Sequence, residues 1–262
     1  MQFGYCLGLD FLRGDTELFN AVSEAGFDYV ELPLSALSML QQNELEELKK
    51  ALSVIPCRAC NFFFPSSISL VGPSMDVPGI RAYLAKMLPI AASLGAEILV
   101  FGNGGARKIP DGATRASVWA NLRTIAELME EYARQTGITI SVEPLNTTET
   151  DIINSFAEAV ELTKGLAHVA TMVDSYHVAM EKQNYSDVLK SPGRLLHLHT
   201  AFPIGRLVPA PGDDMEQYAD FVSAVKQIGY NGKLSVEGAL RGEDTVINEV
   251  AAALGVLRGM FT

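Results

Sequence analysis

Apolar runs of strand length alternate with longer segments of helical period along this whole sequence, and this alternation constrains the fold more than any other feature. The runs are rich in aliphatic and aromatic residues, as expected for strands that are buried on both faces of a parallel sheet. Eight such runs occur, at 3–9, 29–32, 57–63, 98–101, 138–143, 171–174, 195–199 and 234–237. The sequence therefore predicts an α/β protein built from repeated strand–helix units.

The segments between these runs have the apolar spacing of amphipathic helices, at 15–25, 43–53, 76–94, 113–136, 155–164, 186–190, 215–228 and 245–258. Asn43 and Glu46 have the spacing of a capping box at the start of the second segment. Glycines follow several segments where a left-handed C-terminal cap is expected, namely Gly26, Gly95, Gly137, Gly165 and Gly229. These short connections favour a parallel sheet with right-handed crossovers.

The last four runs end in ionisable side chains: Glu143, Asp174, His199 and Glu237. Such groups are costly to bury unless a metal or hydrogen bonds satisfy them. The ends of successive strands surround a common axis in a (β/α)₈ barrel, whereas an open sheet would spread them along a line. The length of 262 residues also suits one barrel. We therefore expect a single TIM-barrel domain over residues 1–262.

Three carboxylates and one imidazole form a ligand set for a divalent cation, and they suit Mn²⁺, Mg²⁺ or Co²⁺ better than a thiolate-bound zinc. Other roles stay open at this point. Either glutamate could be a buried salt-bridge partner, and Asp174 could cap the turn that follows it. His197 lies two residues before His199 and points the same way, so one of them is expected to be the ligand and His197 a deeper core residue.

Four ordered motifs support a family resemblance. They are SVEPLN at 141–146, VDSYH at 173–177, HLHT at 197–200 and SVEG at 235–238, and a strand-four loop FGNGGAR at 101–107 accompanies them. With these motifs the chain resembles the sugar isomerase/epimerase superfamily of xylose-isomerase-like TIM barrels. It is similar in motif above all to ketose 3-epimerases such as D-tagatose and D-psicose 3-epimerase, with hydroxypyruvate isomerases and inosose dehydratases as related members.

The resemblance implies one divalent metal ion, Mn²⁺ first and Co²⁺, Mg²⁺ or Zn²⁺ as alternatives, bound by Glu143, Asp174, His199 and Glu237. It implies that Glu143 and Glu237 are catalytic and that they face opposite sides of a small ketose or related hydroxycarbonyl compound. One glutamate would remove a proton and the other would return it, through a metal-stabilised enediolate.

Glu149, His177 and Arg206 resemble the residues with which ketose 3-epimerases hold sugar hydroxyls. The segment from His199 to Arg206 departs from the family pattern, because it is one residue longer and places Ala-Phe-Pro at 201–203 where acidic and polar residues are common. Substrate identity therefore stays open. Arg206, together with Arg107 and Lys108 in the strand-four loop, could also hold a carboxylate or phosphate, or be solvated.

The net charge of −11 opposes binding to nucleic acid and to anionic membranes. An endonuclease IV-like DNA-repair enzyme, which shares the barrel, is disfavoured by this charge and by a content of only four histidines. With no basic leader and no apolar stretch of about 18 residues, we expect a cytoplasmic protein with a small-molecule substrate and no nucleic-acid or membrane partner. Related barrels suggest a homodimer or homotetramer.

The main rival activity is a dehydratase of the inosose or dehydroshikimate type, because it begins with the same proton abstraction beside a metal-bound carbonyl. A non-catalytic sugar-binding barrel is a third alternative. Cys57 and Cys60 match C-x-x-C spacing but are expected to be reduced core or pocket-lining residues. Phe62, Phe63 and Phe64 end a strand, and we expect at least one ring to be exposed at the barrel mouth.

Overall fold

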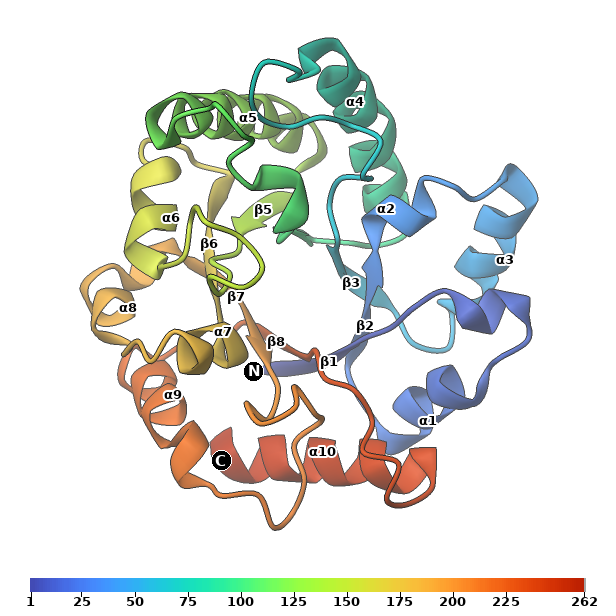
Figure 1. Cartoon of the computed structure of the whole chain (residues 1–262). Helices are drawn as coiled ribbons and strands as arrows, with labels where there is room; N and C mark the ends of the chain where they lie inside the picture. Colours follow the sequence, from blue (N-terminus) through green and yellow to red (C-terminus); the bar gives the residue numbers. More distant parts are fainter. Residues whose placement is uncertain (262) are drawn as a thin grey trace.

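The computed structural model describes residues 1–261, so Thr262 of the predicted domain lies outside the described residues. Over residues 1–261, eight parallel strands form a closed barrel in chain order, and β1 closes it by pairing with β8 (Figure 1). The predicted (β/α)₈ barrel is therefore confirmed. The strands are β1 (Gln2–Cys6), β2 (Tyr29–Pro33), β3 (Cys57–Asn61), β4 (Ile98–Phe101), β5 (Thr139–Val142), β6 (Val169–Asp174), β7 (Leu195–Thr200) and β8 (Lys233–Val236).

Helices surround the barrel, and their apolar faces pack on the outside of the strands (Figure 1). The longer ones follow the predicted segments closely, but α2 and α7 are short helices that the sequence pattern did not indicate. The helices are α1 (Glu17–Ala25), α2 (Leu34–Leu37), α3 (Gln42–Ala51), α4 (Val77–Ser93), α5 (Arg115–Thr136), α6 (Phe156–Leu162), α7 (Ser175–Met180), α8 (Ser186–Lys190), α9 (Glu216–Gln227) and α10 (Val246–Phe261). Single 3₁₀ turns are η1 (Asp10–Arg13), η2 (Gly105–Arg107) and η3 (Pro192–Arg194).

The helix ends confirm one prediction and correct another. The five glycines predicted to follow helices all have positive φ, which is the conformation that a left-handed cap requires. The predicted capping box at Asn43 and Glu46 is wrong, because α3 begins at Gln42 and its N-cap lies two residues before Asn43. Gln41 is its N-cap, and the Gln41 backbone N–H donates to Glu44 Oε2 at 2.7 Å. Among residues 1–261, no helix is long and apolar enough to cross a bilayer.

The barrel interior has an apolar layer below a polar layer. The apolar layer is a separate cluster of buried side chains: Tyr29, Ala59, Ile98, Val100 and Met172. Since side chains alternate along a strand, positions two residues further on share the interior face and lie nearer the carboxyl ends. For Tyr29, Ala59 and Met172 those positions are Glu31, Asn61 and Asp174, all of them buried and polar. Because of this alternation, the polar side chains lie at the carboxyl end of the barrel, where α/β barrels have their active sites.

Candidate active site

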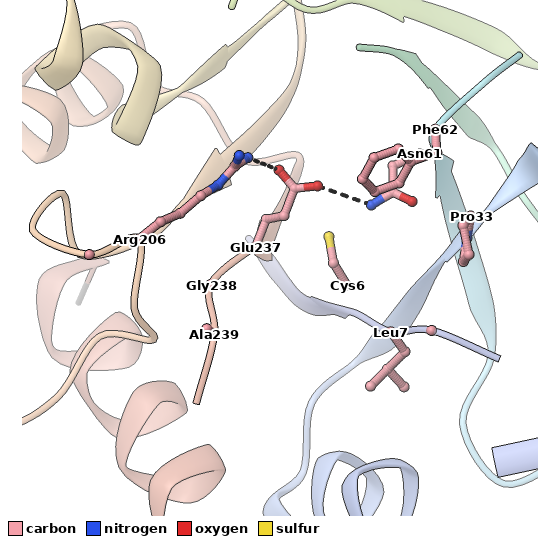
Figure 2. Close-up of a pocket in the computed structure, with 11 residues that line it drawn as sticks. Cys6, Leu7, Pro33, Asn61, Phe62, Arg206, Glu237, Gly238 and Ala239 are labelled. Atoms are coloured by element: carbon pink, nitrogen blue, oxygen red, sulfur yellow. Dashed lines mark hydrogen bonds and ion pairs between the residues drawn. The ribbon is translucent and has the colours of Figure 1, made fainter. Parts of the chain in front are cut away.

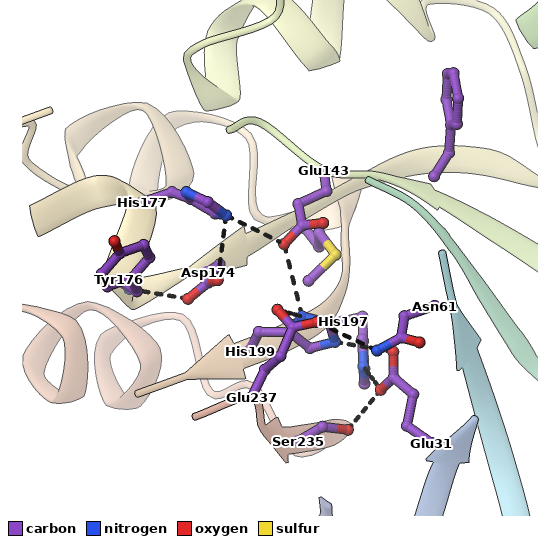
Figure 3. Close-up of polar contacts among 12 residues, drawn as sticks. Glu31, Asn61, Glu143, Asp174, Tyr176, His177, His197, His199, Ser235 and Glu237 are labelled. Atoms are coloured by element: carbon purple, nitrogen blue, oxygen red, sulfur yellow. Dashed lines mark hydrogen bonds and ion pairs between the residues drawn. The ribbon is translucent and has the colours of Figure 1, made fainter. Parts of the chain in front are cut away.

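The four predicted ligand residues converge at the carboxyl end of the barrel. One ligand atom each from Glu143, Asp174, His199 and Glu237 can be chosen so that all lie within 4.8 Å of one another (Figure 3). Asp174 is the last residue of β6 and His199 the last but one of β7, whereas Glu143 and Glu237 directly follow β5 and β8. The side chains are almost wholly buried, apart from Glu237, whose side chain is 17% exposed. We call this group the carboxylate cluster.

Glu31 is a buried carboxylate of β2 that the sequence analysis missed. It accepts hydrogen bonds from Nε2 of His197 and Nε2 of His199, both at 2.9 Å, and from Ser235 Oγ at 2.6 Å (Figure 3). Burial acts against its charge, but the neighbouring histidines hold the pKa of Glu31 well below its ordinary value. A charged residue inside the apolar run Tyr29–Leu32 was the available signal.

These bonds set the tautomer of His199. Because Glu31 accepts from Nε2, that nitrogen carries a proton, and Nδ1 faces the cluster at 3.3 Å from Glu237 Oε2 and 3.6 Å from Glu143 Oε1. Within the described chain, Nδ1 of His199 and Oε1 of Glu143 are buried and make no hydrogen bond. Buried polar atoms without a partner are costly, so the donor set fits a divalent cation at this point. His197 lies deeper, as the sequence predicted.

Gly102 allows Glu143 to approach the cluster. A Cβ atom at this position would lie 1.9 Å from Glu143 Oε2, so any side chain here would displace the carboxylate. Arg107 supports the same segment from below, because its guanidinium donates to the carbonyl oxygens of Phe101 at 3.2 Å and Glu143 at 2.6 Å. Arg107 is fully buried, which contradicts its suggested role in holding an anionic substrate or lying in solvent.

Asp174 has both of the roles that the sequence left open. Its Oδ1 accepts a hydrogen bond from the Tyr176 N–H at 2.9 Å and so caps α7, whereas Oδ2 lies 3.5 Å from His177 Nε2 beside the cluster. The cap explains why a helix begins directly after β6. It also places His177 one helical turn later, over the same cluster.

His177 is oriented by a backbone N–H group that can only donate. The N–H of Asn146 points at His177 Nδ1 at 3.2 Å, so Nδ1 is an acceptor and the neutral ring carries its proton on Nε2. That nitrogen is buried, lies 3.9 Å from Glu143 Oε1 and makes no hydrogen bond among residues 1–261. Asn146 also donates through Nδ2 to Glu149 Oε1 at 3.2 Å, which links His177 and Glu149, two of the predicted substrate-binding residues.

Arg206 reaches the cluster from a hairpin after β7. Its guanidinium lies 2.6 Å from Glu237 Oε2, 3.4 Å from Asp174 Oδ2 and 3.4 Å from Glu149 Oε1. It stacks on the Tyr176 ring with 4.7 Å between Cζ and the centroid, and its backbone has a positive φ of 51°. A positive φ is energetically costly for a residue with a side chain, so the hairpin holds Arg206 in a strained backbone conformation. Carboxylates already surround its charge, which argues against an anionic substrate group.

The environments of the two glutamates differ. Burial raises the pKa of Glu143, and the nearby charge of Glu237 adds to this. Burial acts on Glu237 as well, but the interactions with His199 and the positive charge of Arg206 outweigh it and lower the pKa of Glu237 below its ordinary value. Paired carboxyls with opposite shifts are the arrangement that acid–base chemistry needs.

Two cavities open at the barrel mouth. One of about 400 Å³ is bordered by Glu237, Arg206, Asn61 and Cys6, and Figure 2 shows Glu237 between Arg206 and Asn61. A second, of about 880 Å³, lies over the loops that follow β3, β4 and β5, and Phe62 borders both. Phe62 is 56% exposed while Phe63 and Phe64 are buried, as the sequence predicted for one ring of the three. Cys57 and Cys60 are buried below, with free thiols 4.0 Å apart.

This chain is similar to known proteins both in sequence and in fold. A family model described as xylose isomerase-like TIM barrel matches residues 19–258. A D-psicose 3-epimerase of Enterocloster bolteae is 31% identical over 254 residues, covering 87% of this chain and 78% of that protein. A 3-dehydro-D-guloside 4-epimerase of Escherichia coli is 25% identical, covering 87% and 88%. The crystal structure of a D-psicose 3-epimerase with D-tagatose from Clostridium cellulolyticum H10 superposes with a TM-score of 0.82 at 22% identity, covering 100% and 99%.

Proposed function

Because this chain belongs to the xylose isomerase-like TIM barrel family, we propose that it is a sugar epimerase that requires one divalent metal ion. Its relatives are sugar epimerases by name, and the carboxylate cluster supplies the residues that such a reaction needs. The observation that carries the proposal is the pair Glu143 and Glu237, whose carboxylates lie 3.6 and 3.3 Å from His199 Nδ1 and whose pKa values are shifted in opposite directions.

Glu143, Asp174, His199 and Glu237 would hold the cation, Mn²⁺ first, with Co²⁺, Mg²⁺ or Zn²⁺ as alternatives. When bound, the metal supplies a Lewis acid that polarises a sugar carbonyl and acidifies the neighbouring C–H bond.

Glu237 would remove the proton from carbon beside the carbonyl, and Glu143 would return a proton from the other face, which inverts that carbon. Arg206 favours the base form of Glu237 through their 2.6 Å contact. In the reverse direction the two glutamates exchange roles. The anion that forms between these steps is the enediolate of the sugar.

His177 and Glu149 would bind sugar hydroxyls next to the reacting carbons. Nε2 of His177 carries a proton that points into the site, and Glu149 is partly exposed at the border of the larger cavity. A donor on one side and an acceptor on the other suit a hydroxyl group, which can accept and donate at once.

The proposal is tested by NMR in D₂O with the Mn²⁺-loaded protein and a chelator-treated control. Neutral ketoses, 3-keto-glycosides, hydroxypyruvate, inososes and ketose phosphates are the substrates to compare. We expect metal-dependent deuterium incorporation beside the carbonyl of a neutral sugar, together with its epimer. Loss of water from an inosose would instead make this chain a dehydratase, and no exchange despite tight metal binding would overturn the enzymatic proposal.

A further inference from the structure

The larger cavity adjoins the site and extends beyond the carboxylate cluster, over the loops that follow β3, β4 and β5. It is bordered by Gly102, which contacts Glu143, and by Glu149, which contacts Arg206. Small-molecule sites have volumes of about 300–1,000 Å³, so the cavity of about 400 Å³ beside Glu237 is already of the size of a small ligand's site. The further 880 Å³ is room for a second group.

Phe62 forms the boundary between the two cavities, and its conformation is unusual. Its ring is more than half exposed and its backbone has φ of 43°, a region that is costly for a bulky residue. Hydrogen bonds to neighbouring segments of the protein hold this conformation. Ser35 donates its N–H to the Phe62 carbonyl at 3.0 Å, and the Asn103 side chain binds both the N–H and the carbonyl of Phe64, at 3.0 and 2.9 Å. An exposed aromatic ring held in this way is a stacking surface for the C–H face of a sugar.

The lining of the larger cavity suits a neutral, hydroxyl-rich group. Serine and threonine side chains alternate there with apolar ones, and Ser66, Ser67 and Thr148 offer hydroxyls that can both donate and accept. Among the lining residues of the described chain, Lys108 and Glu149 are the charged ones, and their charges are opposite. Arg107, the other cation of this loop, is buried beneath it on backbone carbonyls. A lining with one positive and one negative charge does not favour binding of a phosphate group.

We propose that the larger cavity is a subsite for a neutral glycosyl group, so that the substrate is a keto sugar carrying a second sugar ring. This inference rests on the proposed function, because the keto sugar itself would react between Glu143 and Glu237. The second ring would pass Phe62 and Glu149 and bind against the serine-rich loop after β3.

A substitution that fills the cavity tests the subsite. A Cβ atom at Gly105 would meet no heavy atom within 4 Å, and Gly105 lines the cavity in η2, so Gly105→Trp adds a bulky ring at the border of the cavity without a clash at Cβ. Gly193 is the matched control, since it is also exposed, lies in the 3₁₀ turn η3 and has the same open surroundings. The turn η3 directly precedes β7, so Gly193 lies at the opposite end of the barrel from the cavities.

The probes are methyl 3-keto-β-D-glucopyranoside, the disaccharide in which a second glucose replaces the methyl group, and D-fructose. Wild-type protein should exchange deuterium into the disaccharide with a kcat/KM at least about tenfold above that for the methyl compound. Gly105→Trp should remove this advantage and leave exchange into the methyl compound unchanged. Gly193→Trp should behave as wild type.

Equal kcat/KM for one and two rings in the wild type, with exchange present, would overturn the subsite and leave the proposed function intact. Retention of the disaccharide preference by Gly105→Trp would likewise overturn the subsite alone. Exchange with none of the three probes would contradict the proposed function, and the subsite with it. The comparison of one-ring and two-ring substrates uses wild-type protein, so it tests the subsite even if Gly105→Trp misfolds.

Discussion

Glu31 Oε1 lies 2.9 Å from Nε2 of His199, and this hydrogen bond determines which imidazole nitrogen faces the carboxylate cluster. Ser235 and His197 occupy the other oxygen, Oε2. Glu31 therefore has a full set of donors although it is wholly buried. Because Glu31 binds Nε2 of His199, the lone pair of Nδ1 is directed at the place where the ligand atoms of the cluster converge.

Glu31→Gln should weaken metal binding. A glutamine amide can accept from one histidine but presents N–H groups to the other, so one imidazole must change tautomer or lose its bond. We expect Mn²⁺ affinity, measured by calorimetry, to fall about 10–100-fold. Glu47→Gln, an exposed change in α3, is the control. A folded Glu31→Gln protein with wild-type affinity would show that Glu31 does not position His199.

Gly102→Ala should displace Glu143. The new Cβ atom would lie 1.9 Å from Oε2, and the carboxylate would have to rotate away from the cluster. We expect weaker Mn²⁺ binding and slower exchange, each by about tenfold or more. Gly105→Ala changes the same loop where space is open and should have little effect. Similar behaviour of the two variants would contradict this role of Gly102.

Arg206→Ala should reduce activity toward neutral and anionic substrates alike. The guanidinium is already paired with Glu237, Asp174 and Glu149. Its loss therefore removes the positive charge that keeps the base Glu237 ionised, and it does not remove a group that binds an anionic substrate. We expect kcat/KM for a ketose and for its phosphate to fall by a similar factor, roughly 10–100-fold. Arg134→Ala, on the exposed face of α5, is the control. A loss confined to the phosphate would restore the anion-binding hypothesis.

Glu249 gives stability a dependence on pH at a place remote from catalysis. Its carboxylate, in α10, accepts the N–H groups of Arg241, Glu243 and Asp244, and although burial opposes them these bonds lower its pKa. The ionised form therefore stabilises the fold above the unfolded-state pKa of about 4.3, and this contribution is lost as pH falls through the lower folded-state value.

Glu249→Gln should accordingly lower the free energy of unfolding in urea at pH 7 by about 1–3 kcal/mol. The difference from wild type should shrink as pH falls below about 4. Glu243→Gln, an exposed neighbour, should leave the urea midpoint unchanged. A destabilisation that is constant from pH 7 to pH 3 would show that ionisation of Glu249 is not its source.

The barrel could be predicted from the sequence because strand and helix periods alternate cleanly, and β4 matches its predicted bounds residue for residue. The convergence of Glu143, Asp174, His199 and Glu237 followed from strand order alone. Glu31 could not be paired with His197 and His199 from the sequence, because the contact crosses the barrel from β2 to β7 and exists only once the sheet has closed.

Side-chain direction in loops was the other limit of the sequence. Arg107 and Lys108 are neighbours of equal charge, yet one is buried beneath Glu143 and the other is exposed at the cavity. Nothing in the periodicity separates them. The positive φ of Phe62 and of Arg206 likewise depends on hydrogen bonds to distant segments.

The most direct test of the central claim is deuterium exchange into the substrate by wild-type protein, Glu143→Gln and Glu237→Gln. All three are compared at saturating Mn²⁺, with metal occupancy checked by electron paramagnetic resonance. If the two glutamates are the acid–base pair, the wild type should exchange and epimerise, and each variant should lose at least about 10²-fold in epimerisation while metal remains bound. Full exchange and epimerisation by both metal-loaded variants would contradict the two-base mechanism.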